Sequence, residues 1–184
     1  DYAYDSRRRI EDLAAPGVTG AEAARRTVAR LGAGQVQTRE MPVLFEPRVA
    51  SGLMGHFVGA VTGSSLYRNA SFLKDRAGDR IFPDWLNVLE RPLLRRGAGS
   101  SSFDSEGVAT RERRLVDGGV LTGYVLSSYS ARRLGLQTTA NAGGVRNLLL
   151  EPGGESCETP LERLRDGLYV TELMGQGVNL VTGD

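Results

Sequence analysis

Histidine, cysteine and lysine are scarce in this chain of 184 residues, which contains one of each: His56, Cys157 and Lys74. A zinc site built from protein ligands usually needs three or four histidine, cysteine or carboxylate side chains held close together. One histidine and one cysteine therefore exclude a Cys₂His₂ or His₃ site within the chain. A serine–histidine–aspartate triad would have to use His56 as its base.

Disulfides, long apolar runs and a secretion signal are also missing. A single cysteine cannot form an internal disulfide, which argues against a secreted, disulfide-rich scaffold. No window of about 18 apolar residues exists, so no transmembrane helix is expected. The first residues, Asp1 to Arg7, are polar and lack the apolar core of a signal peptide. We expect a soluble, cytoplasmic protein with no membrane association.

The basic residues other than Lys74 are all arginine, yet 23 basic and 22 acidic side chains give a net charge of only +1. A duplex-binding protein normally concentrates excess positive charge on one face, because affinity comes from neutralising phosphates. Nucleic acid is therefore an unlikely partner.

Residues 1–40 and 41–184 differ in pattern. Thr19 to Glu22 reads as a capping box that opens a helix over about 20–31, and Gly32 is a natural stop. Residues 41–45 are apolar and predict a strand. We expect a domain boundary between Arg39 and Pro47.

Residues 49–73 have a helical pattern that is unusually rich in glycine. A glycine inside a helix costs about 0.5–1 kcal/mol relative to alanine, so several of them need a reason. Two explanations for these glycines remain open: tight packing of the helix on a sheet, or a surface against which another chain or a peptide lies.

The second half of the chain reads as β-rich with short helices. Two strands joined at Asp117-Gly118 predict a hairpin over 111–126, and residues 127–134 predict a short helix that Gly135 ends. A further capping box lies at 159–162, and strands are expected over 168–173 and 178–182. The sequence thus predicts an α+β fold with a mixed, largely antiparallel sheet, one long glycine-rich helix and short helices.

Few residues offer chemistry. His56 is either an acid–base residue or an ordinary helix histidine beside the core. Cys157, in a polar loop without a second cysteine, reads as an incidental thiol. The segment 138–144 is either a plain loop or a binding loop that offers backbone groups to a ligand, with Asn141, Gly143 and Gly144 as low-ranking candidates for substrate binding.

Several strings along nearly the whole chain resemble the TldD/PmbA family, also called modulators of DNA gyrase, and in particular its PmbA (TldE) branch. They are Ser51-Gly52-Leu53-Met54-Gly55-His56, Gly63-Ser64-Ser65-Leu66-Tyr67-Arg68, Phe103-Asp104-Ser105-Glu106-Gly107-Val108, Gly119-Val120-Leu121-Thr122-Gly123-Tyr124, Ser127-Ser128-Tyr129-Ser130-Ala131-Arg132, Thr138-Thr139-Ala140-Asn141-Ala142-Gly143-Gly144 and Glu172-Leu173-Met174-Gly175-Gln176-Gly177-Val178-Asn179.

The resemblance implies a subunit of a cytoplasmic zinc-dependent protease that acts on small or unfolded peptides. TldD-type subunits carry a His-Glu-x-x-x-His motif on this helix, which places Ser51 and Gly52 where the first histidine and the glutamate stand and leaves only His56. We therefore expect no zinc site and no catalysis in this chain, with zinc held by a TldD-type partner. A homodimer of the isolated chain is an alternative assembly.

The resemblance also implies that the chain is a fragment, with residues 1–40 closing a middle domain and 41–184 opening the C-terminal domain. Two other functions stay open: a self-sufficient hydrolase that uses His56, and a regulator that binds DNA or gyrase.

Overall fold

The computed structural model describes residues 1–151, 160–164, 166–175 and 177–184, and it divides the chain into two compact units. The first unit comprises Asp1–Glu40 with Arg95–Ala98, and the second comprises Met41–Leu94 with Gly99–Asp184. Within the part of the chain that is described, no helix combines the length and apolar character that crossing a bilayer requires.

The first unit contains a short 3₁₀ helix, η1 (Ile10–Asp12), and the helix α1 (Pro16–Val28). The expected capping box at Thr19 is wrong. The helix starts one turn earlier with Pro16 in its first position, where the missing proline N–H costs nothing, and Ala15 is the N-cap. The carboxylate of Glu22 instead accepts hydrogen bonds from Arg25 and Arg26, at 2.7 Å each.

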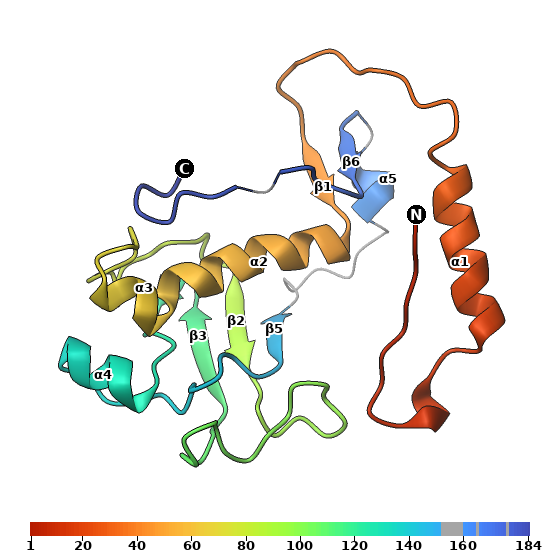
Figure 1. The fold of residues 1–184 in the computed structure, drawn as a ribbon. Coiled ribbons are helices and arrows are strands. Elements are labelled where there is room, and N and C mark those ends of the chain that lie inside the picture. Colours follow the sequence, from red (N-terminus) through yellow and green to blue (C-terminus); the bar gives the residue numbers. More distant parts are fainter. Residues whose placement is uncertain (152–159, 165, 176) are drawn as a thin grey trace. The chain divides into compact units, whose positions relative to one another are not determined.

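The second unit is built on an antiparallel sheet of four strands in the order β4-β3-β2-β5 (Figure 1). The strands are β2 (Asn87–Glu90), β3 (Arg113–Asp117), β4 (Val120–Leu121) and β5 (Leu148–Glu151). A separate two-stranded parallel sheet pairs β1 (Val43–Phe45) with β6 (Leu168–Val170). The predicted α+β class with mostly antiparallel pairing is confirmed.

The expected long glycine-rich helix is two helices, α2 (Pro47–Val61) and α3 (Gly63–Tyr67). Thr62 between them is extended, because the chain at Val125 pairs there: Val125 N–H donates to Val61 O at 3.0 Å, and Gly63 N–H donates to Val125 O at 2.9 Å. A Cβ on Gly63 would lie 2.5 Å from the Cβ of Ser130, so glycine is needed for the approach of the next helix.

The predicted short helix is confirmed as α4 (Ser128–Leu134), which Ser127 caps at its start and Gly135 ends in a left-handed conformation. The predicted hairpin is also confirmed, but its turn is Gly118-Gly119, one residue later than expected, with both φ angles positive. A last helix, α5 (Pro160–Leu164), starts at the predicted proline, whereas Thr159 lies outside the described residues.

The strand expected over 178–182 is wrong. Asn179 accepts a backbone hydrogen bond from Gly183 at 2.8 Å, and its side chain accepts one from Val181 N–H, so the chain turns. The turn lies against α2, with Leu180 Cδ1 at 3.6 Å from a Cβ built on Gly59.

The core lies between α2 and the four-stranded sheet, across which α2 runs in Figure 1. Pairs such as Phe57–Phe82, with ring centroids 5.2 Å apart in an edge-to-face arrangement, continue the core around α2. The buried cluster consists of Phe57, Ala60, Val61, Leu66, Leu73, Val88, Leu115, Val116, Leu121, Tyr124, Val125, Leu126 and Ala131. The core therefore packs α2, the helix that carries Ser51, Gly52 and His56, against the sheet.

Candidate functional site

Ser51 and His56, which the family resemblance compares with the two histidines of the TldD-type motif, lie on two sides of α2. Ser51 and His56 are five positions apart, which on a helix is a rotation of about 140°. Ser51 lines a cleft of about 360 Å³ between α2 and β5, whose walls include Val58 and Leu150. His56 lines a separate apolar pocket of about 240 Å³. The structure therefore does not bring the two side chains together.

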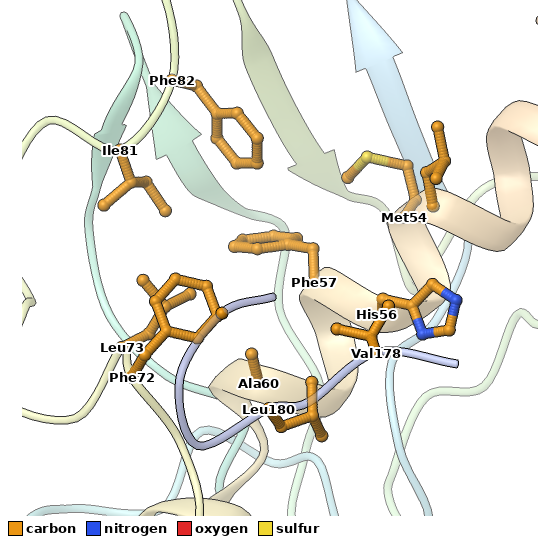
Figure 2. Close-up of a pocket in the computed structure, with 12 residues that line it drawn as sticks. Met54, His56, Phe57, Ala60, Phe72, Leu73, Ile81, Phe82, Val178 and Leu180 are labelled. Carbon is orange, nitrogen blue, oxygen red and sulfur yellow. The ribbon is translucent and has the colours of Figure 1, made fainter. Parts of the chain in front are cut away.

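The pocket beside His56 is formed by aromatic and aliphatic groups and closed on one side by the C-terminal turn (Figure 2). Figure 2 shows the imidazole of His56 turned away from the ring of Phe57, which packs against Phe82 inside the pocket. Leu180 and Gly183 contribute from the C-terminal turn. The imidazole is thus at the rim of an apolar cavity and is half-buried.

Ser51 and Gly52 do not fit a metal. The hydroxyl of Ser51 donates a hydrogen bond of 2.6 Å to Arg48 O in its own helix, and Gly52 has no side chain. Over the described ranges, no group of three or more histidine, cysteine, aspartate or glutamate side chains could hold an ion. The donors on α2 amount to one imidazole, which is too few for a zinc site.

The loop at 138–144 lines a third, more polar cleft of about 240 Å³. Of its predicted binding residues, Gly143 and Gly144 present backbone to this cleft with φ angles of 89° and 101°. Asn141 also lines the cleft, but its side chain is directed inward and the residue is only 5% exposed.

Asn141 belongs to a buried polar network with Glu90 and Arg113. Its Nδ2 donates to Glu90 Oε1 at 2.8 Å, and its Oδ1 accepts from Arg113 Nη2 at 2.9 Å. Arg113 Nε in turn donates to Glu90 Oε2 at 2.9 Å, which closes a ring of three side chains. The side chains of Glu90 and Arg113 are 3% and 16% exposed. Asn141 therefore fixes the shape of the loop, and the side chain is largely used by these bonds.

Asp104 holds the other flank of the loop. Its carboxylate accepts hydrogen bonds from the backbone N–H groups of Glu106, Val108 and Ala142, at 2.9, 2.9 and 3.0 Å. Burial raises the pKa of Asp104, but these N–H donors and the charge of Arg146 outweigh it and hold the pKa below the ordinary 3.8. The ionised form therefore stabilises the loop.

Tyr67, which lines the third cleft, has a second aromatic ring and two arginines around its own ring. The rings of Tyr67 and Tyr129 meet edge to face with centroids 5.7 Å apart. The guanidinium groups of Arg68 and Arg133 lie 5.6 and 5.5 Å from the centre of the Tyr67 ring. The sequence analysis did not single out these four side chains, although three of them, Tyr67, Arg68 and Tyr129, belong to segments that carry the family resemblance.

The buried pair Glu90–Arg113 was missed as well. The alternation of Asn87 to Glu90 ends on a glutamate, which the sequence alone gives no reason to bury. Cys157, read as an incidental thiol, lies outside the described residues.

A helix that packs across a four-stranded antiparallel sheet, with a separate two-stranded parallel sheet, defines the class of fold. Residues 38–184 match the PmbA/TldA metallopeptidase C-terminal domain, and the chain belongs to that family. The predicted family is thereby confirmed.

Proteins of known family are similar to this chain over its whole length. It is 49% identical over 184 residues to the metalloprotease PmbA of Escherichia coli O157:H7 and 45% identical over 185 residues to a PmbA homologue of Haemophilus influenzae. All of this chain but only 41% of each relative is covered. A crystal structure of a candidate modulator of DNA gyrase from Bacteroides thetaiotaomicron VPI-5482 superimposes with a TM-score of 0.91 at 31% identity, over 99% of this chain and 41% of that one.

Proposed function

We propose that this chain is a PmbA/TldE-like subunit of a metalloprotease complex that acts on small or unfolded peptides, and that the zinc is held by a TldD-type partner. The observation that carries the proposal concerns α2: Ser51 and His56 line different cavities. The family resemblance supports it, because it places Ser51 and Gly52 where a TldD-type subunit has a zinc ligand and a base.

Zinc-dependent hydrolysis requires protein ligands, an open coordination position and a base for the attacking water. Ser51 uses its hydroxyl within its own helix, and Gly52 supplies no base. A partner that supplies ligands and base would make the reaction possible, and this chain would then contribute walls of the chamber and part of the peptide-binding surface.

An edge of the sheet supports a role in holding extended peptides. β5 pairs with β2 on one side, and the strand order places β5 at the end of the sheet. Such an edge can accept a further strand through its backbone groups. Leu149 and Leu150 are 36% and 49% exposed on this strand, and both line the cleft beside α2. An extended peptide with apolar side chains fits this edge.

The test compares peptide cleavage by the assembled complex with and without intact His56. We expect His56→Ala to leave the cleavage rate within about twofold, because the imidazole contacts no reacting group in this scheme. The matched control removes the glutamate of the partner's motif and should abolish cleavage. Metal analysis of this chain purified alone should give no stoichiometric zinc. One tightly bound zinc per chain, or a large loss of rate in His56→Ala, would contradict the proposal.

The two other functions gain no support from the geometry. A hydrolase using His56 would need a nucleophile within hydrogen-bond reach of the imidazole, and Ser51 lines a different cleft. A DNA-binding role would need concentrated positive charge, and the net charge is +1.

A further inference from the structure

The polar cleft between α3 and α4 is separate from both cavities beside α2. We name it the α3–α4 cleft. Its hydroxyl and aromatic groups come from two short helices, and its far side is the backbone of the 138–144 loop. It is lined by Thr62, Gly63, Ser64, Tyr67, Val125, Ser127, Tyr129, Ser130, Asn141, Ala142, Gly143 and Gly144.

Two arginines that lie against Tyr67, a residue lining this cleft, form no salt bridge among the described residues: Arg68 and Arg133. Elsewhere in the same unit, exposed arginines such as Arg91 and Arg114 pair with carboxylates at 3.0 and 2.8 Å. Both unpaired guanidinium groups instead lie within 5.6 Å of the centre of the Tyr67 ring. One aromatic ring at the edge of the cleft is therefore flanked by two positive charges.

The acidic group that contacts α4 is at the other end of that helix. Glu106 accepts a hydrogen bond of 2.8 Å from Ser128 N–H at the first residue of α4. Arg133 is five residues further along, about 7 Å at the rise of a helix. Glu106 therefore forms no salt bridge with Arg68 or Arg133 in the part of the chain that is described.

Hydrogen-bond donors in the cleft are also unused. Over the described part of the chain, the phenol hydroxyls of Tyr67 and Tyr129 and the backbone N–H of Gly143 have no hydrogen-bond partner. Tyr129 is 50% exposed, so its hydroxyl is accessible from solvent. Donors of this kind, placed beside two guanidinium groups, suit an anionic acceptor.

We infer that the α3–α4 cleft binds a carboxylate of a peptide, either its free C-terminus or an aspartate or glutamate side chain. A guanidinium group matches the two oxygens of a carboxylate through two parallel hydrogen bonds. A cavity of about 240 Å³ accommodates one residue rather than a folded surface. The inference rests on the proposed function, because a peptide is what carries the carboxylate.

Calorimetric titration of the full-length chain with matched peptides tests this site. One pair differs in a free or amidated C-terminus, and a second differs in an internal glutamate or glutamine. The carboxylate of at least one pair should strengthen binding about five- to tenfold, a range expected for two partly exposed ion pairs. The pair that shows the difference identifies which carboxylate is bound.

The double variant Arg68→Gln/Arg133→Gln should remove that difference in affinity and leave the binding of the uncharged peptides unchanged. Arg80→Gln is the matched control, because Arg80 is exposed and donates to Gly118 O at the hairpin end of β3. It should retain the full difference. Arg68→Lys/Arg133→Lys, which keeps the charge without the planar fork, should retain part of it. Circular dichroism of each variant verifies the fold.

Equal affinities for both members of both pairs overturn the inference but leave peptide binding, and hence the proposed function, standing. Absence of binding by every peptide overturns both. A third arm uses inorganic phosphate as competitor: displacement of the carboxylate peptide at concentrations below those of acetate would assign the site to phosphate and overturn the assignment to peptides.

Discussion

The two units of this chain differ in how far their apolar and charged side chains are buried. In the first unit no residue is buried, and Val18, Val28 and Leu31 are each more than 60% exposed. Its contacts are polar, such as the salt bridge of 3.2 Å between Arg96 and Asp12. In the second unit a continuous apolar cluster joins α2 to the sheet. Packing of an apolar face, rather than helix propensity, usually stabilises a helix of this length.

Two glutamates make the contrast concrete. Glu22 in the first unit accepts hydrogen bonds from Arg25 and then Arg26, and these bonds lower the pKa of Glu22 to about 2 in solvent. Glu90 in the second unit meets Arg113 and Asn141 inside the protein. Glu90 also accepts a hydrogen bond of 2.7 Å from Arg146 N–H. Loss of partners costs free energy mainly at the buried carboxylate, because water replaces lost partners at the surface.

The largest expected effect is the loss of the charge of Glu90. Glu90→Gln keeps the volume of the side chain but leaves Arg113 without a counter-charge, so we expect a loss of about 3–5 kcal/mol in the free energy of unfolding. Urea denaturation measures it. The matched variant Glu22→Gln should leave the urea midpoint unchanged within error. Equal losses in the two variants would remove the contrast between the units.

The second-largest expected loss of stability comes from truncating a side chain in the core. Leu115 is fully buried, and Leu115→Ala should cost about 2–5 kcal/mol through lost burial and the cavity left behind. Leu31, 74% exposed, is the control, and Leu31→Ala should change the free energy of unfolding by less than about 0.5 kcal/mol. Thermal unfolding followed by circular dichroism compares them. A Leu31 variant as unstable as the Leu115 variant would mean that this side chain is covered in solution.

The smallest of the three effects depends on pH. In the folded protein the pKa of Asp104 is below its ordinary value of 3.8. Its ionised form therefore adds to the free energy of unfolding above about pH 5, and this contribution is lost as the pH falls through 3.8 and below. Asp104→Asn should cost about 1–3 kcal/mol near pH 7, because three backbone donors lose a charged acceptor. The difference between wild type and variant should shrink towards pH 3 in urea denaturation. A difference independent of pH would contradict this role.

Local signals in the sequence identified the elements whose ends are set by neighbouring residues. Ser127 and Gly135 bound α4 because a hydroxyl cap and a left-handed C-cap act within one turn. The hairpin at β3 and β4 likewise follows from turn residues, even though the turn is shifted by one position.

Long-range contacts account for what was missed. β2 and β5 pair with each other from positions about 60 residues apart in the chain, and neither segment carries a strong alternation that marks it alone. The helix breaks at Thr62 because the backbone of Val125 forms hydrogen bonds with Val61 and Gly63. A helical sequence pattern contains no information about a hydrogen-bond partner so far along the chain.

The candidate site divides in the same way. That α2 carries Ser51 and Gly52, which offer no strong metal ligand and no base, is visible in the sequence, because it concerns residue identity. Two other features depend on where the strands and short helices are placed. The side chain of Asn141 donates to the buried Glu90, and two arginines lie against the ring of Tyr67.

The sequence by itself determined the family, the mixed fold and the presence of a single imidazole on α2, since each of these depends on which side chains are present and on contacts a few residues apart. Only the tertiary structure decided that Ser51 and His56 open into different cavities and that a buried carboxylate fixes the 138–144 loop. These are consequences of packing α2 against a sheet assembled from distant segments, where burial decides which polar groups must find partners inside the protein.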